Sequence, residues 1–192
     1  MKLTLLRHGM TEGNRRRLYY GSTDLPLLPE GIEQLRRMAA AGSYPTAARY
    51  YTSGLVRTEQ TLEALYGPVE HTALPGMREI DCGRWEMKSY DQLKDDPVYL
   101  RWCEDMDNVA CPGGESFAQV RRRVLAAVQP LLAAGEDAVC VTHGGVIGFL
   151  LQAWFPVPEE ENYTRIPAPG AGYQITVEHG TPVSYRPVPE KE

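Results

Sequence analysis

The sequence predicts an α/β protein: a three-layer α/β/α sandwich with a mostly parallel central sheet and an antiparallel edge strand. Short apolar runs bounded by turns occur at Lys2–Leu6, Ala47–Thr52 and Ala138–Thr142, as expected for buried strands. A helical pattern follows each run, and strands that alternate with helices favour a parallel sheet covered on both faces. Two later runs, Tyr173–Glu178 and Val183–Pro187, flank a glycine turn and predict a closing hairpin, which supplies the antiparallel edge.

Two helices are expected in the first third of the chain. One begins at Pro29 and runs to about Ala41, and the other begins at Leu55 and ends near Gly67. Proline is favoured in the first turn of a helix and glycine just beyond its end, so both segments carry suitable boundary signals. A short strand is expected after the second helix, around Val69–Thr72.

Two more helices are expected in the second half. Ser116 is suited to cap a long helix, which Pro130 is expected to kink or limit. An apolar helix is expected over Val146–Trp154, after the third buried strand. Residues 81–114 are rich in turns, charges and aromatics and predict no definite element, and the proline-rich residues 156–169 are interpreted as a surface loop.

Length and composition fit a single domain over residues 1–192. The chain has 43% hydrophobic and 23% charged residues, enough for a substantial core without disulfides or metals. Its net charge of −5 gives no indication of nucleic-acid binding. No stretch approaches the roughly 18 consecutive apolar residues of a membrane span, so no membrane partner is expected.

The four cysteines indicate a reducing environment. Cys82, Cys103, Cys111 and Cys140 form no Cys-x-x-Cys pair and no Cys/His spacing typical of a metal site, so free thiols and no bound metal are expected. The apolar run at the N-terminus is too short for a signal peptide. A cytoplasmic location is therefore expected, whereas the sequence gives no indication of the oligomeric state.

Arginine and histidine side chains follow three of the expected strands. Arg7 and His8 come directly after the first strand, Arg57 opens the helix after the second, and His143 follows the third. Because ligands bind at the carboxyl ends of parallel strands, all four side chains are expected to converge. Arginines clamp phosphate oxygens, and they disfavour a charged imidazole, which keeps His8 neutral and nucleophilic. His143 would then donate to the oxygens of the transferred phosphoryl group.

Each of these residues also has a plain structural explanation. A histidine after a strand is commonly a hydrogen-bonded structural residue, and an arginine in the first turn of a helix commonly lies in solvent. His8, Arg57 and His143 each follow the same kind of strand-to-helix turn. This repetition weighs against a purely structural explanation for the whole set. The residues therefore predict a phosphate pocket with a histidine nucleophile.

These residues belong to a longer series of motifs that resembles the histidine phosphatase superfamily, the phosphoglycerate-mutase-like proteins. The matches run in the family's order from residue 3 to about residue 150. The matched positions are Arg7-His8-Gly9 with Thr11 and Asn14, Gly21, Asp24-Leu25-Pro26-Leu27, Ser53 with Leu55, Arg57, Gln60 and Thr61, Glu79 with Gly83, Trp85 and Glu86, Pro112-Gly113-Gly114-Glu115-Ser116, and Thr142-His143-Gly144-Gly145.

The resemblance implies a role for each site residue. His8 would attack the phosphoryl group and carry it as a phosphohistidine, with Arg7, Arg57 and His143 completing the catalytic set. Glu79, which on its own would be taken for a surface carboxylate, would protonate the leaving oxygen and then activate water. No metal or other cofactor is implied, because the arginines supply the positive charge. The implied substrate-binding residues are Arg7, Thr11, Asn14, Gly21, Arg57, His143 and Gly144.

The chain departs from the family pattern at three places. Met10 stands where the family often has glutamate, and Leu18 stands where it often has arginine. Leu28 precedes Pro29 where a serine or threonine usually caps the helix, which costs about 1 kcal/mol of helix stability. Leu18 affects how substrate is bound rather than phosphoryl transfer itself.

The resemblance favours a phosphatase over a mutase. The two reactions differ in whether water or a substrate hydroxyl attacks the phosphohistidine, and the family's mutases carry a long insertion that the segment between Trp85 and Cys111 is too short to hold. Residues 81–114 would form a short pocket cover that leaves the phosphoenzyme open to water. Short members of the family include α-ribazole phosphatases and broad-specificity phosphatases, and the chain resembles either. We therefore expect a metal-independent phosphomonoesterase for a small phosphorylated metabolite, with α-ribazole phosphate as a candidate substrate.

Two alternatives remain open: a phosphoglycerate mutase that depends on a bisphosphoglycerate cofactor, and a non-catalytic phospholigand-binding relative. The second predicts the loss of His8, Glu79 or an arginine, and none of these is missing. The aromatic side chains Tyr90, Tyr99 and Trp102 of the expected cover either stack on a substrate ring or fill a small core, and the core is favoured.

Overall fold

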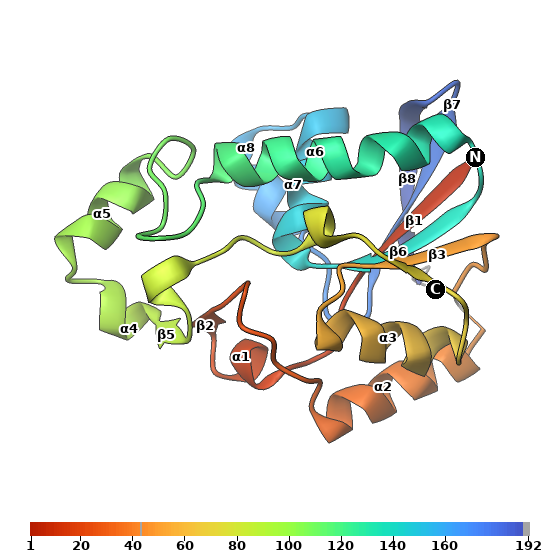
Figure 1. Ribbon diagram of the computed structural model, residues 1–192, viewed down its shortest axis with the longest axis horizontal. Coiled ribbons are helices and arrows are strands. Elements are labelled where there is room, and N and C mark those ends of the chain that lie inside the picture. Colours follow the sequence, from red (N-terminus) through yellow and green to blue (C-terminus); the bar gives the residue numbers. More distant parts are fainter. Residues whose placement is uncertain (43, 190–192) are drawn as a thin grey trace.

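Helices cover both faces of a central β-sheet in the computed structural model, which describes residues 1–42 and 44–189 (Figure 1). Within this part of the chain the main sheet has six strands, in the order β4-β3-β6-β1-β7-β8. The first four strands are parallel to one another, whereas β7 is antiparallel to both β1 and β8. The strands are β1 (Lys2–Arg7), β3 (Arg49–Thr52), β4 (Thr72–Ala73), β6 (Ala138–Thr142), β7 (Gly172–Glu178) and β8 (Thr181–Val188). The predicted sandwich is confirmed, with the β7–β8 hairpin as its antiparallel edge.

The sheet separates two hydrophobic cores. On one face, α6 (Phe117–Ala134) and α7 (Gly144–Trp154) pack on Ala138 and Cys140 of β6. On the other face, α2 (Pro29–Ala40) and α3 (Val56–Tyr66) pack on Val139 and Val141. Both faces of β6 are therefore buried, which explains why its sequence is apolar throughout.

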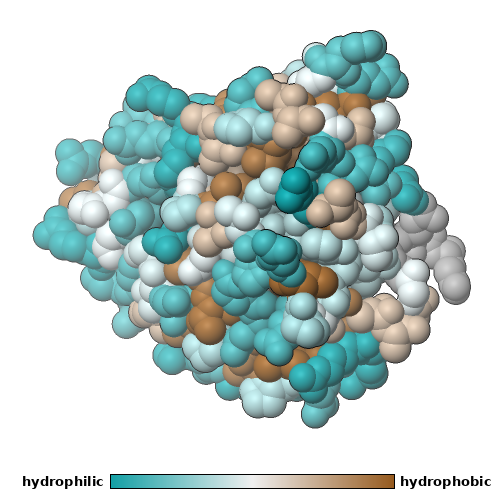
Figure 2. Space-filling view, turned by 45° about the vertical axis from the view of Figure 1, so that its right-hand side comes forward, coloured by the Kyte–Doolittle hydropathy of each residue, from teal (hydrophilic) through white to brown (hydrophobic). Residues whose placement is uncertain are grey.

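The predicted helices are all present, and α2 begins at Pro29 without a side-chain cap, as the sequence indicated. The strand expected around Val69–Thr72 is shifted to Thr72–Ala73, where it pairs with the end of β3. The surface seen in Figure 2 is mostly hydrophilic, with smaller apolar patches between. Among the residues described, no helix is long and apolar enough to cross a membrane.

Residues 81–114 form a small layer of their own beside the sheet (Figure 1). Its two-stranded sheet pairs β5 with β2, and its aromatic core includes Tyr99 and Trp102, whereas Tyr90 is 59% exposed. The core-filling interpretation is thus confirmed for two of the three aromatic residues. The short elements in and next to this layer are α1 (Glu12–Arg15), β2 (Leu18–Tyr19), η1 (Pro75–Met77), η2 (Gly83–Trp85), β5 (Lys88–Ser89), α4 (Tyr90–Leu93) and α5 (Pro97–Glu104).

The segment interpreted as a surface loop, residues 156–169, holds two short helices, α8 (Glu159–Asn162) and η3 (Tyr163–Arg165). The buried guanidinium of Arg165 fixes them, because it donates to the carbonyl of Phe155 and to side-chain oxygens of Gln152 and Asn162. The proline-rich composition gave no sign of this buried arginine.

Pro130 does not end α6, which continues to Ala134, so the expectation that it limits the helix was wrong. The last turn is held by Leu131 and Leu132, whose side chains are buried in the core. Gly135, with a left-handed φ of 70°, ends the helix instead.

Replacing Pro130 with alanine should stabilise the protein. The ring of Pro130 is exposed, and a proline inside a helix removes one backbone hydrogen bond and clashes with the preceding turn. We expect Pro130→Ala to raise the free energy of unfolding by about 1–3 kcal/mol in urea denaturation followed by circular dichroism. The neighbouring exposed variant Gln129→Ala should change it by less than about 0.5 kcal/mol. An unchanged or lower value for Pro130→Ala would show that the helix is already adapted to the proline.

Candidate active site

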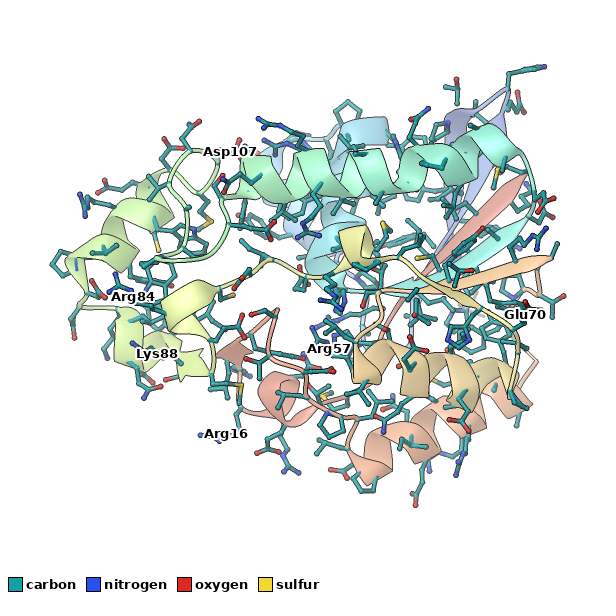
Figure 3. The ribbon with its side chains drawn as sticks, viewed as in Figure 1. Arg16, Arg57, Glu70, Arg84, Lys88 and Asp107 are labelled. Carbon is teal, nitrogen blue, oxygen red and sulfur yellow. The ribbon has the colours of Figure 1, made fainter. Side chains whose placement is uncertain are left out.

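A cavity of about 270 Å³ opens at the carboxyl ends of β1, β3 and β6. Five of the predicted site residues line it: Arg7, His8, Asn14, Arg57 and Glu79. Figure 3 shows Arg57 reaching from the start of α3 towards the centre of the molecule. The strand ends therefore bring together side chains far apart in the sequence, as expected for a parallel sheet.

His8 is held in the form of a neutral nucleophile. Its Nδ1 lies 2.7 Å from the carbonyl oxygen of Gly9, which can only accept, so Nδ1 carries the proton and Nε2 keeps a lone pair. Burial, which is the largest cause, and the charges of Arg57 and Arg7 together lower the pKa of His8 to about 3. The arginines were predicted to keep His8 neutral, but desolvation is the larger cause.

Arg57 is a fully buried cation. Its two terminal nitrogens donate to the carbonyl oxygens of Gly21 (2.8 Å) and Thr23 (2.9 Å), and its guanidinium lies 5.0 Å from the centre of the Tyr20 ring. In the described part of the chain no carboxylate forms a salt bridge with it. Because a buried charge without a counter-ion is costly, this arrangement is prepared for an anion.

Arg7 adds a second cation to the same wall. One terminal nitrogen donates to the carbonyl oxygen of Pro167 at 2.8 Å, while the buried Nε has no hydrogen-bond partner. Gly144, the first residue of α7, lies beside this guanidinium: a Cβ there would be 3.2 Å from Arg7 Nε. Gly144 is therefore placed next to an arginine of the cavity rather than on the cavity wall.

His143 is oriented by a chain of hydroxyl groups. Thr58 Oγ1 donates to the carbonyl oxygen of Leu55, so the hydroxyl of Ser53 donates to Thr58 and accepts from Nε2 of His143 at 2.8 Å. This chain fixes the proton of the neutral imidazole on Nε2. The sequence gave no reason to single out Ser53 or Thr58 for this task, although Ser53 is one of the matched motif residues.

His143 lies behind the cavity and does not line it. Its Nδ1 is 3.4 Å from Arg57 Nε, which donates to it, and its ring centre is 5.2 Å from that of His8. Burial is the main reason why the pKa of His143 lies well below its usual value, and the charge of Arg57 lowers it as well. In this state the lone pair of His143, and not its N–H group, faces the arginine.

Glu79 lies on the cavity wall beneath the start of α7. The backbone N–H of Gly145 donates to Oε2 at 3.0 Å, and that of Ile80 donates to Oε1 at 3.1 Å. A Cβ at position 145 would come within 2.6 Å of Oε1, so only glycine lets the carboxylate take this position. The second glycine after His143 thus orients the carboxylate at the rim.

Thr11 and Asn14 have different places. Asn14 lines the cavity, and its side-chain oxygen accepts from the backbone and hydroxyl of Thr11, which leaves the NH₂ group for a ligand. Thr11 is fully buried, caps α1, and lies 2.6 Å from the hydroxyl of Tyr20, so it supports the wall from behind. Gly21 also lies off the wall, where its carbonyl holds Arg57.

Glu86 was not singled out for a role in the site, yet it organises the loop that holds Arg57. Its carboxylate accepts from the backbone N–H groups of Gly21, Ser22, Thr23 and Cys82, and from the hydroxyl of Thr23. Burial opposes ionisation, but these hydrogen bonds outweigh it and lower the pKa of Glu86. The only sign in the sequence was its place beside Trp85 in a matched motif.

The assembled groups can bind a tetrahedral oxyanion and attack it. Two arginines without carboxylate partners in the described chain, Arg57 fully buried and Arg7 partly buried, attract the anion, and His8 presents a lone pair beside them. Glu79 can exchange a proton at the rim. This combination suits nucleophilic transfer of a phosphoryl group.

Replacing Glu86 with glutamine should weaken the binding of inorganic phosphate. Glutamine keeps the shape but turns an acceptor towards N–H groups into a donor, so the loop that positions Arg57 is disturbed. We expect titration calorimetry to show a Kd raised about tenfold, equivalent to about 1.4 kcal/mol. Glu63→Gln, an exposed carboxylate on α3, is the matched control and should bind phosphate normally. Unchanged affinity in Glu86→Gln would exclude the positioning role.

Comparison with known proteins agrees with this geometry. The family model for the histidine phosphatase superfamily (branch 1) matches residues 3–186. The adenosylcobalamin/α-ribazole phosphatase of Salmonella typhimurium is 32% identical over 164 residues, which cover 82% of this chain and 81% of that protein. A phosphoglycerate mutase structure from Thermus thermophilus is 31% identical with a TM-score of 0.75, covering 96% of this chain and 98% of that chain.

The α-ribazole phosphatase structure from Shigella flexneri shares the fold, with a TM-score of 0.87 at 24% identity over 99% of this chain and 96% of that chain. The family match spans nearly the whole sequence and includes every motif that carried the resemblance. The chain therefore belongs to the histidine phosphatase superfamily and is a phosphatase.

Proposed function

We propose that this phosphatase hydrolyses a small phosphomonoester through a phosphohistidine on His8, without a metal ion, and that α-ribazole phosphate is its substrate. The observation that carries the mechanism is the buried His8 with its Nε2 lone pair beside two arginines that have no carboxylate partner in the described residues. The substrate is supported by the 32% identity to the Salmonella α-ribazole phosphatase.

The first step transfers the phosphoryl group to the enzyme. The lone pair on Nε2 of His8 forms the P–N bond while the ester P–O bond breaks, and Glu79 gives its proton to the leaving oxygen. In the second step Glu79 takes a proton from water, whose oxygen attacks phosphorus and displaces His8 as the P–N bond breaks. A positioned acid and base of this kind contributes about 10²–10⁴-fold in rate.

Arg7 and Arg57 stabilise the charge on the transferred phosphoryl oxygens in both steps. Asn14 adds its NH₂ group, while Thr11, Gly21 and Gly144 support the wall. The phosphate dianion favours protonation of His143 by its opposite charge. A protonated His143 donates to a phosphoryl oxygen from Nδ1 once the Nε–H of Arg57 has turned away from that atom, while Nε2 keeps its bond to Ser53.

Phosphoglycerate mutase activity is the second candidate, because the Thermus thermophilus structure of that name is 31% identical. Leu18 favours the phosphatase: it lines the cavity where the family often has arginine, and an apolar side chain gives no partner for the carboxylate of phosphoglycerate. The short segment between Trp85 and Cys111 favours it as well. We propose a single domain in which residues 81–114 cover the pocket, and a cytoplasmic location in keeping with the four free thiols.

The central test is hydrolysis of p-nitrophenyl phosphate in EDTA. We expect turnover without added metal, and His8→Ala should abolish it because the nucleophile is lost. His71→Ala, a change outside the cavity, is the control and should remain active. Activity close to that of the unaltered protein in His8→Ala would exclude the phosphohistidine. Brisk conversion of 3-phosphoglycerate to 2-phosphoglycerate in the presence of 2,3-bisphosphoglycerate would instead establish the mutase.

Glu79→Gln tests the proton donor. The variant should lose about 10²-fold or more in kcat for an alkyl phosphate, whose alkoxide must be protonated as it leaves. It should lose much less for p-nitrophenyl phosphate, since p-nitrophenolate leaves without a proton. Glu63→Gln again controls for the loss of one carboxylate. Equal losses on both esters would contradict the acid role.

A further inference from the structure

A second and larger cavity adjoins the first. It has a volume of about 530 Å³ and is bounded by residues 103–107, the start of α6, α7, and the segment of α8 and η3. The two cavities share Phe117, Gly145 and Phe149 on their walls. We propose, resting on the proposed function, that the second cavity is the leaving-group site and selects a flat, apolar group without negative charge.

The geometry of phosphoryl transfer gives the direction. The attacking atom and the leaving oxygen lie roughly in line through phosphorus, so the leaving group extends away from His8. Glu79 protonates that oxygen, and the carboxylate of Glu79 accepts from the backbone N–H of Gly145 at 3.0 Å. Because Gly145 lines both cavities, the leaving oxygen lies at their junction and the rest of the leaving group enters the second cavity.

The floor of the second cavity is aromatic. The rings of Phe117 and Phe149 meet edge to face with their centres 5.0 Å apart, and both are only partly buried by the protein. Tyr163 and Ile166 also line this cavity and are 54% and 38% exposed, so their apolar surface is available to a ligand. A flat ring placed between these side chains would bury apolar surface on both of its faces.

Most polar side chains that line this cavity already have hydrogen-bond or ion-pair partners in the protein. Gln152 and Asn162 give their side-chain oxygens to Arg165, which does not line the cavity, and Arg121 pairs with Asp107 at 3.1 Å. The charges that remain on the wall are two exposed carboxylates, Glu104 and Asp105. Asp105 accepts from Asn108, a neutral partner, so its charge is not compensated.

The two cavities therefore have opposite electrostatic characters. The first holds the cations of Arg7 and Arg57, and the second carries the uncompensated carboxylates Glu104 and Asp105. A phosphomonoester with a neutral or cationic leaving group therefore binds in one orientation only, with its phosphate in the first cavity and its leaving group in the second. A leaving group with a carboxylate or a second phosphate is repelled from the second cavity, which excludes phosphoglycerate as a good substrate.

Three benzyl phosphates test the charge preference, since they differ in the para substituent and little in leaving-group chemistry. We expect kcat/KM for 4-methylbenzyl and 4-(aminomethyl)benzyl phosphate to exceed that for 4-carboxybenzyl phosphate about tenfold or more, the factor that about 1.4 kcal/mol gives. In the double variant Glu104→Gln/Asp105→Asn this ratio should narrow to within about threefold, mainly by a higher kcat/KM for the carboxylate ester. The double variant Glu63→Gln/Asp91→Asn removes two charges outside both cavities and should keep the original ratio.

The apolar preference has its own measurement. Tyr163→Ala should raise KM for 2-naphthylmethyl phosphate several-fold and leave KM for methyl phosphate nearly unchanged, because Tyr163 lines only the second cavity, which methyl phosphate does not reach. Equal kcat/KM for the three benzyl esters, or an unchanged ratio in Glu104→Gln/Asp105→Asn, would overturn the proposed leaving-group site while the phosphatase activity stands. Failure to hydrolyse any of these esters, and p-nitrophenyl phosphate as well, would overturn the proposed function and this inference with it.

Discussion

The guanidinium of Arg57, fully buried and held by carbonyl oxygens instead of carboxylates, is the interaction on which the site depends. Carbonyl dipoles satisfy its N–H groups without cancelling its charge, so the charge remains available to a bound oxyanion. Glu86 fixes the loop that supplies these carbonyls by accepting hydrogen bonds from its backbone N–H groups. The negative charge of Glu86 therefore lies behind the loop. The fold thus stabilises a cation by hydrogen bonding while leaving its electrostatic field directed into the cavity.

Burial has a second effect at the same place, because it removes the charge from both histidines. His8 keeps a lone pair on Nε2 since Gly9 fixes its proton on Nδ1, and His143 has the reverse tautomer because Ser53 takes its Nε2 proton. Each imidazole is therefore set by a different neighbour, although the two rings lie only 5.2 Å apart. The site therefore combines a neutral nucleophile with the cations of Arg7 and Arg57.

Much of this could be predicted from the sequence. Arg7, Arg57 and His143 follow buried strands, and the rule for parallel strand ends was enough to bring them together with His8. Glu86, Ser53 and Thr58 could not be found in this way, because their roles arise where loops from distant segments meet. Residues 81–114 lack periodicity since their core is assembled from short elements, and the burial of Arg165 in a proline-rich stretch has no local signal. The family resemblance implied Thr11, Gly21 and Gly144 as substrate-binding residues, but these three support the cavity wall from behind and do not line it.

Gly145 has a consequence for how such an enzyme can diversify. It donates to Glu79, has no room for a side chain, and is the point at which the two cavities join. On one side of it lie the reacting groups, Arg7, His8 and Arg57 from the strand ends together with Glu79. On the other side the residues come from 103–107, the start of α6, the part of α7 beyond Gly145, and the segment of α8 and η3, which carry none of the reacting groups. Descendants of this chain could therefore acquire new substrates through changes in those outer segments alone, while inheriting the reaction intact.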